Sequence, residues 1–254
     1  MKIGSTITYN AFRLGYIPDL TIRSLLLFCD KVVVVDGGSN DGSLEMLKNM
    51  SAHDDRIIIK EGFPMSHWTD TAKLQQLALN ECEFGDWHCH LDADEVMHED
   101  DFEDLNELFL QDEWDFFTFR WVHFYETLEK LQPILPSTIP RFFRYRRGYH
   151  YDSFQDVGNM PMIDTNVPLN GSHKHFPVMT QIRVFHLGWA RPLHCQNNKY
   201  KIFSKMYGKE DHFVGYDSSY GEKINFNELP DVLQCALKER GGTIWDERYN
   251  EKIK

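Results

Sequence analysis

The sequence predicts an α/β fold in which a mostly parallel central sheet is flanked by helices, and two observations carry this prediction. Short apolar runs alternate along the first half of the chain with segments whose apolar residues recur at helical spacing. One of these runs, KVVVVDGG at residues 31–38, is continuous and closed by glycines, which is typical of a strand buried on both faces of a parallel sheet. Open sheets of this kind bind ligands at the carboxyl ends of their strands.

The expected elements follow one another in a regular order. Strands are expected at residues 3–9, 31–36, 56–62 and 87–94, with helices between them at 19–29, 43–50 and 70–83. Pro18 precedes the first of these helices, where its fixed backbone angle suits the first helical turn. A fourth helix is expected at 101–111, with acids at its start that favour the helix dipole. Later the pattern loosens: residues 141–151 and 181–192 resemble strands, and the tail from Asn197 begins as a helix.

Composition limits the classes of function. The chain has 254 residues, of which 42% are apolar and 14% aromatic, so it is long enough to bury a sizeable core. A formal net charge of −12 argues against a surface that coats nucleic acid, because phosphate binding draws mainly on positive charge. The five cysteines include no CxxC pair, which indicates reduced thiols. No apolar run reaches the length of a membrane span and the N-terminus turns polar too early for a signal peptide, so a cytoplasmic location is expected.

The stretch WHCHLDADEVMHED at residues 87–100 opens a run of acids. Eight acids fall within residues 92–104, and those from Glu99 onward are explained by the following helix. Asp92 and Asp94 are not, because they end the expected strand, where residues two apart project to the same side. A lone DxD is more often a solvated turn, but at a strand end the two carboxylates can converge on a divalent ion that also binds phosphate oxygens.

A second candidate site is VVVVDGGSNDGS at residues 32–43. Asp36 ends the buried strand, where its carboxylate can accept hydrogen bonds from the edge of a nucleobase. The alternative is an ordinary turn from strand to helix, for which the glycines and the Asn40-Asp41-Gly42 tripeptide are equally suited. The stretch is neither a Walker loop nor a GxGxxG dinucleotide motif.

Three further features have one structural and one functional interpretation each. His186 ends the apolar run RVFHLGWARP and is either a core histidine or a third ligand to a metal or diphosphate, to which Lys199 adds charge. Trp121 and Trp189 are either core residues or stacking faces for a sugar. Four arginines lie close together and either balance local acids or contact an anionic ligand: Arg141, Arg144, Arg146 and Arg147.

Taken together, these motifs resemble the inverting family-two glycosyltransferases with the GT-A fold. Members of that family close their first strand with a stretch like Thr8-Tyr9-Asn10, end the second with VDDGSTDGT where this chain has VDGGSNDGS, and end the fourth with a metal-binding DxD, here LDADE. The likeness extends over about residues 3–205. It is greatest to the branch that adds sugars to lipopolysaccharide cores, whose DWxLxLDADE, RLFR and H-x-G stretches have counterparts in DWHCHLDADE, RFFRYRRGYHYDSFQD and FHLGWARP.

The resemblance implies a role for each matching residue. Thr8, Tyr9, Asn10 and Asp36 would hold the nucleotide of a sugar donor. The metal and diphosphate would be bound by Asp92, Asp94, His186 and Lys199, with Asp92, Asp94 and His186 as the metal ligands. The metal would be Mn²⁺ or Mg²⁺, and the donor a UDP-sugar in preference to a GDP-sugar.

The resemblance also implies a catalytic base, because inverting transfer needs a carboxylate to deprotonate the acceptor hydroxyl. Asp156 falls where the family has a glutamate, with Gln155 in place of the family's histidine, and Asp152 is its nearest competitor. Gly37 stands where the family usually has a second aspartate, so one nucleotide contact differs.

The expected organisation is one GT-A domain over residues 1–205, with a nucleotide-sugar half (1–125) and an acceptor half (126–205), followed by a packed extension (206–254). The expected function is metal-dependent transfer of a sugar to the hydroxyl of a glycan or a lipopolysaccharide-type glycoconjugate, and a lipid-linked acceptor would place the protein at the cytoplasmic face of a membrane. One alternative is a catalytically inactive nucleotide- or carbohydrate-binding module on the same fold. A phosphohydrolase ranks lower, because its DxD usually follows the first strand.

Overall fold

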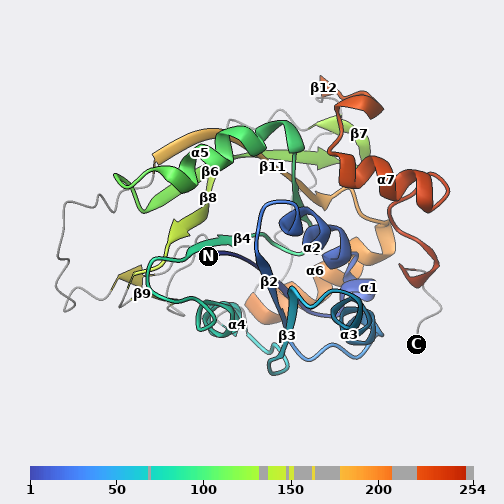
Figure 1. The fold of residues 1–254 in the computed structure, drawn as a ribbon. Coiled ribbons are helices and arrows are strands. Elements are labelled where there is room, and N and C mark those ends of the chain that lie inside the picture. Colours follow the sequence, from blue (N-terminus) through green and yellow to red (C-terminus); the bar gives the residue numbers. More distant parts are fainter. Residues whose placement is uncertain are drawn as a thin grey trace.

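The computed structural model describes residues 1–67, 70–131, 137–146, 149–151, 162–163, 178–207 and 222–249. Within these residues a ten-stranded sheet runs through the molecule in the order β12-β7-β6-β8-β4-β1-β2-β3, with β11 paired to β6 and β5 paired to β11 (Figure 1). The sheet thus joins strands from both halves of the sequence. Helices flank it, which confirms the α/β prediction.

The first half of the chain forms the parallel part of the sheet. Four strands lie side by side here: β1 (Lys2–Thr8), β2 (Lys31–Asp36), β3 (Ile57–Glu61) and β4 (Trp87–His90). β1 pairs in parallel with β2 and β4, and β2 with β3, so their carboxyl ends meet at one edge. Alternate residues of β2 enter two different core clusters: Val32 and Val34 one, Val33 and Val35 the other. The continuous apolar run therefore forms a strand buried on both faces.

Three helices accompany these strands, close to the positions that the sequence predicts. They are α2 (Pro18–Leu26), α3 (Ser43–His53) and α4 (Asp70–Leu79). A short helix α1 (Ala11–Leu14), which the apolar pattern did not reveal, follows β1. The prediction for β4 was too long: it ends at His90, and residues 91–94 leave the sheet before β5 (Glu95–Met97).

The second half contributes mainly antiparallel strands. β6 (Phe116–Tyr125) and β8 (Ser137–Arg144) pair with each other, and β8 also pairs with β4. β11 (Val178–Trp189) runs parallel to β6 and antiparallel to β5, which places His186 opposite both Glu95 and His123. The remaining strands are short: β7 (Thr127–Leu131), β9 (Tyr149–His150), β10 (Met162–Ile163) and β12 (Glu222–Lys223). The predicted strand at 141–151 is thus divided between β8 and β9.

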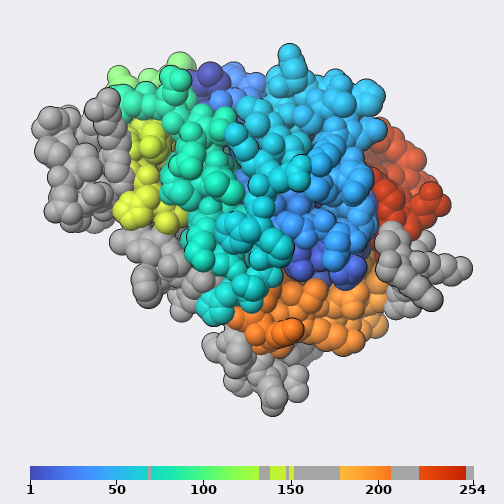
Figure 2. Space-filling view, turned by 90° about the horizontal axis from the view of Figure 1, so that it is seen from below, coloured from blue at the N-terminus to red at the C-terminus, as the bar shows by residue number. Residues whose placement is uncertain are grey.

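The last helices close over the N-terminal segment. α6 (Leu193–Tyr207) lies against α1, and Figure 2 shows its orange segment directly beside the blue N-terminal residues. Near the end of the described chain, Trp245 Nε1 donates to the carbonyl of Gly15 (3.3 Å) and the Tyr249 hydroxyl donates to the carbonyl of Tyr16 (2.8 Å). The other C-terminal elements are the helix α7 (Asp231–Glu239) and the 3-10 turns η2 (Phe226–Glu228) and η3 (Glu247–Tyr249).

The acid-rich segment after β5 divides in two. Its first acids form a 3-10 turn, η1 (Glu99–Asp101), and the predicted helix begins only after it as α5 (Phe102–Leu110). Leu105 of α5 is fully buried and packs into the core. A search of the described helices found none long and apolar enough to cross a bilayer.

Candidate active site

A cavity of about 290 Å³ lies where the predicted site residues converge. It is lined from the carboxyl ends of β1 and β4, from β11 and from α6, together with Tyr16 of the α1–α2 loop and Trp121 of β6. Six of the predicted residues line it: Thr8, Tyr9, Asp92, Asp94, His186 and Lys199. The structure thus brings together predicted residues that are up to 191 positions apart in the chain.

Asp36 stands beside this cavity at the end of β2, with its side chain buried and held in place. One carboxylate oxygen, Oδ2, accepts the backbone N–H groups of Gly38 (2.9 Å) and Ser39 (2.8 Å). Gly38 has φ +81°, and a Cβ there would come within 2.9 Å of the Pro64 backbone, so the turn needs glycine. The other oxygen, Oδ1, is buried without a hydrogen-bond partner among the described residues. Such a group is costly unless a ligand supplies the missing donor.

Two more unsatisfied groups lie on the neighbouring segment. Asn10 adopts the left-handed conformation (φ 47°), and its Oδ1 accepts the N–H of Asn40 at 2.8 Å, which fixes the orientation of the amide. Its Nδ2 is buried and, within the described residues, has no partner, and the same holds for Thr8 Oγ1. Thr8 is the register partner of Asp36. An unused acceptor, an unused donor and an unused hydroxyl therefore collect at two adjacent strand ends.

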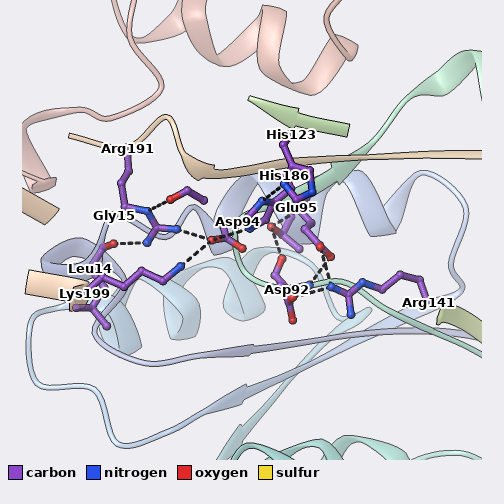
Figure 3. A network of polar contacts seen from close by, with 12 residues as sticks. Leu14, Gly15, Asp92, Asp94, Glu95, His123, Arg141, His186, Arg191 and Lys199 are labelled. Atoms are coloured by element: carbon purple, nitrogen blue, oxygen red, sulfur yellow. Dashed lines mark hydrogen bonds and ion pairs between the residues drawn. The ribbon is translucent and has the colours of Figure 1, made fainter. Parts of the chain in front are cut away.

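The DxD segment has a different character, because its acids are paired with cations of the chain itself. Arg141, on β8, has a fully buried side chain, and its Nη2 donates to Asp92 Oδ2 (2.6 Å) and to Glu95 Oε1 (2.7 Å) (Figure 3). Glu95 Oε2 in turn accepts the N–H of Asp92 at 2.9 Å, which closes the turn. Asp92 keeps 41% of its side chain exposed, whereas Glu95 is fully buried.

Asp94 is buried and meets three nitrogen groups on one oxygen, Oδ2. Arg191 Nη2 donates a hydrogen bond to it, and Lys199 Nζ and His186 Nε2 each lie 3.7 Å away (Figure 3). Arg191 is itself fixed, since it also donates to the carbonyls of Gly188 (2.9 Å) and Leu14. The second aspartate of the DxD thus lies among cations.

Two histidines lie behind Asp94. His123 Nδ1 and His186 Nδ1 are 2.9 Å apart, so one ring donates and the other accepts, and Trp121 covers both rings. Burial lowers the pKa of His186 to about 3 and the pKa of His123 to about 4, so both are neutral near pH 7. Gly188 makes room for this arrangement, because a Cβ there would lie 2.3 Å from the His186 ring.

The charges determine which groups are ionised. Burial alone would raise the pKa of Asp94, but His186, Lys199 and Arg191 outweigh burial and lower it. Burial, together with the Asp92 charge, raises the pKa of Glu95 to about 8 despite Arg141. The pKa of Asp92 is lowered, because Arg141, His90 and His186 together outweigh the effect of burial. Burial and the Arg191 charge lower the pKa of Lys199 to about 8, which leaves it mostly protonated at neutral pH.

The resemblance implies a divalent ion, and the arrangement of the donor atoms does not fit one. The carboxylates are suitable oxygen ligands for Mg²⁺ or Mn²⁺, but both aspartates already have cationic partners. Among the described residues, the group of three whose ligand atoms all approach within 4.8 Å of one another is His98, Glu99 and Asp100, outside the cavity. Asp92, Asp94 and His186 do not form such a group, and their role as metal ligands stays a prediction.

Sequence reasoning placed some functional residues and missed others. The predicted base Asp156 and its competitor Asp152 lie outside the described residues. Arg141 and Arg191, which hold the DxD, were missed as site residues, as were His123 and Tyr16. The signal for Arg191 was its place two residues after Trp189 at the end of a predicted strand, and Arg141 belonged to the arginine cluster whose interpretation was left open.

The sequence matches the family model described as Glycosyl transferase family 2 over residues 6–165, and no curated protein matches it significantly. Among solved structures, S. aureus TarS 1-349 is 16% identical with a TM-score of 0.41, covering 57% of this chain and 47% of that one. The same protein in complex with UDP is 19% identical with a TM-score of 0.40, covering 51% and 40%. This chain therefore covers less than half the length of these structures.

The match to the family model shows to which family the chain belongs. It extends over more than half of the sequence and includes the ends of β1, β2 and β4, where the unsatisfied polar groups and the DxD are found. Arg191 and Lys199 lie beyond its last residue. On this evidence the chain belongs to glycosyl transferase family 2.

Proposed function

We propose that the protein is an inverting glycosyltransferase that moves a sugar from a nucleoside diphosphate donor to an acceptor hydroxyl. The single observation that carries the proposal is the buried, unsatisfied Asp36 Oδ1 at the end of β2, beside the unsatisfied Asn10 Nδ2. A nucleobase edge offers complementary hydrogen-bonding groups, and the cavity continues from Thr8 towards Lys199, whose charge suits a diphosphate.

The hydrogen-bonding pattern favours uracil. Uracil has one N–H donor flanked by carbonyl acceptors, which complements one free carboxylate oxygen and one amide N–H. Guanine would present two adjacent donors and would need both carboxylate oxygens, but Oδ2 of Asp36 is occupied by Gly38 and Ser39. We therefore propose a UDP-sugar as donor in preference to a GDP-sugar. The complex of the similar TarS structure with UDP is consistent with this choice.

In the proposed reaction the acceptor oxygen bonds to the anomeric carbon as the bond from that carbon to the diphosphate breaks, and the bonding electrons leave with the diphosphate. The acceptor proton passes to a carboxylate, for which Asp156 remains the candidate and Asp152 the competitor. His186 and Lys199 line the cavity beside Asp94 and would contact the diphosphate. A Mn²⁺ or Mg²⁺ ion would supply positive charge to the leaving group if bound.

The class of acceptor is proposed from the sequence motif that carries the DxD. The DWHCHLDADE stretch supports a glycan or lipopolysaccharide-type glycoconjugate, by its resemblance to the lipopolysaccharide-core branch. A lipid-linked acceptor would bring the protein to the cytoplasmic face of a membrane as a peripheral protein.

The test is a thermal-shift screen of UDP, GDP and their sugars, followed by an assay for slow hydrolysis of the stabilising sugar nucleotide. We expect UDP and a UDP-sugar to raise the melting temperature and the UDP-sugar to be hydrolysed. Stabilisation without any release of UDP would indicate a binding module, and the absence of stabilisation by every nucleotide would overturn the proposal.

A further inference from the structure

The acids around the DxD are balanced within the chain. Three cations, from Arg141, Arg191 and Lys199, face the charges of Asp92 and Asp94, because the raised pKa of Glu95 leaves that carboxyl mostly protonated near pH 7. The repulsion between the two aspartates, which would otherwise call for a divalent ion, is thus already offset by side chains. An additional doubly charged ion would have to approach these cations without any excess of negative charge to attract it.

The two cations at Asp94 are not equivalent. Arg191 is fully buried and its guanidinium is used on Asp94, Gly188 and Leu14, so it neutralises Asp94 from inside the protein. Lys199 lines the cavity, keeps 18% of its side chain exposed and lies farther from the carboxylate, at 3.7 Å. Because Arg191 already compensates Asp94, the ammonium of Lys199 presents positive charge to the cavity.

The position of this ammonium is set by its neighbours. Lys199 Nζ lies over the rings of Tyr16 (5.2 Å) and Phe203 (5.6 Å), whose faces favour a cation. Tyr16, Phe203 and Met206 also line the cavity, so Lys199 is held among apolar walls where its charge is weakly screened. A rigid, poorly solvated cation of this kind is suited to an anionic ligand.

We propose that Lys199 takes the place of a divalent ion: it binds the donor diphosphate directly, and the enzyme works without a metal. This inference rests on the proposed function and deepens it. When the bond between the anomeric carbon and the diphosphate oxygen breaks, the electron pair stays on that oxygen, and the Lys199 ammonium donates a hydrogen bond to the charge that develops there. Asp94 then serves as a positioning residue that orients Lys199 and Arg191, not as a metal ligand.

The experiment measures the affinity of the full-length protein for UDP and for uridine by calorimetry, in excess EDTA and in millimolar MnCl₂. We expect UDP to bind in EDTA with nearly the affinity found in Mn²⁺. Lys199→Met should weaken UDP about 10- to 100-fold, the loss of one charge-assisted hydrogen bond, and leave uridine binding unchanged. The matched control is Lys201→Met, which replaces an exposed lysine of the same helix and should change the affinity for neither UDP nor uridine. Lys199→Arg should restore part of the UDP affinity.

Asp94→Asn distinguishes a metal ligand from a positioning residue, because the two roles predict opposite effects on UDP binding. A metal ligand would lose Mn²⁺-dependent UDP binding on this change, whereas removing a negative charge beside Lys199 should leave UDP binding in EDTA intact or strengthen it. Far-UV circular dichroism and a melting curve show whether the variant is folded, and Lys199→Met decides the matter if it is not. UDP binding that requires Mn²⁺ and is unchanged in Lys199→Met would overturn this inference and leave the proposed function standing. Failure of both UDP and uridine to bind would instead reject the proposed function.

Discussion

Two strand ends at the same edge of the sheet carry acids, and the surroundings of these acids are opposite. Asp36, at the end of β2, is held by two backbone N–H groups, and its second oxygen has no partner within the described residues. Asp92 and Asp94, just beyond β4, have arginine or lysine partners for their carboxylates. Under the proposed function, a ligand would donate to the free oxygen of the first site and would meet the cations of the second, whose acids are already paired. An acid at a strand end therefore indicates a ligand site, but its partners decide what it binds.

The largest expected effect is on stability, at the strand end where Arg141 is paired with Asp92 and Glu95. Arg141→Met would leave Asp92 and Glu95 close together without their shared cation, and Glu95 is fully buried. Removing one partner of a buried ion pair costs about 3–5 kcal/mol of unfolding free energy. Urea denaturation measures this loss, and Arg23→Met, whose ion pair with Glu239 is exposed on both sides, should stay within about 0.5 kcal/mol of the original protein. A stability loss below 1 kcal/mol for Arg141→Met would show that the acids do not depend on this arginine.

The next largest effect is on nucleotide binding, at the strand end that carries Asp36. Asp36→Asn would place an amide N–H in the position of an acceptor, so we expect UDP and uridine to bind about 10- to 100-fold more weakly. The protein itself should keep most of its stability, because the amide oxygen of the variant can still accept the Gly38 and Ser39 N–H groups, and the replaced oxygen has no partner within the described residues. Calorimetric titration checks the affinity, with the exposed Asp55→Asn as control. Equal losses for uridine and UDP place the contact at the base; a loss confined to UDP would contradict the assignment of Asp36.

A third group sharpens the comparison, because it lacks a partner but lies within a strand and not at a strand end. His88 of β4 is buried against Phe143, and among the described residues neither ring nitrogen has a hydrogen-bond partner. Burial lowers the pKa of His88 to about 3, so below pH 6.5 the unfolded chain takes up a proton that the folded protein does not. Stability is therefore lost as the pH falls from about 6.5 towards 3, by up to about 1.4 kcal/mol per pH unit for this residue.

His88→Leu should make that decline shallower without affecting UDP binding. Unfolding free energies at pH 7 and pH 5 measure the difference between variant and original protein. The exposed His53→Gln serves as control and should leave the pH dependence unchanged. An identical decline in His88→Leu would show that other histidines account for the acid sensitivity.

The sequence was sufficient for the parallel part of the fold and for the residues that meet at its carboxyl edge. β-branched runs and turn residues act locally, so β1 to β3 and their helices could be predicted within a few residues. β5 could not, because three residues form a strand only when β11 lies beside them. α7 was also missed, in a tail whose helix is stabilised by packing of Leu233 and Ala236 into the core.

For the site, motifs identified the acids but not their partners. Arg141 and Arg191 meet Asp92 and Asp94 across separations of 49 and 97 residues. Such pairs leave no periodic signal in a single sequence, and an arginine in an acidic chain is ordinarily a surface residue. The sequence therefore predicted metal ligands, which stays a prediction, but not the internal cations that the structure places beside Asp92 and Asp94.

The contacts of Gly15 and Tyr16 have a consequence for biosynthesis. Arg191 donates to the carbonyl of Leu14. Trp245 and Tyr249 donate to the carbonyls of the next two residues, Gly15 and Tyr16. A growing polypeptide can form its parallel strands early, yet the wall that carries Tyr16 is fastened only after residue 249 has left the ribosome. A nascent chain in which Trp245 and Tyr249 have not yet emerged would therefore leave the Tyr16 wall of this cavity without these two hydrogen bonds.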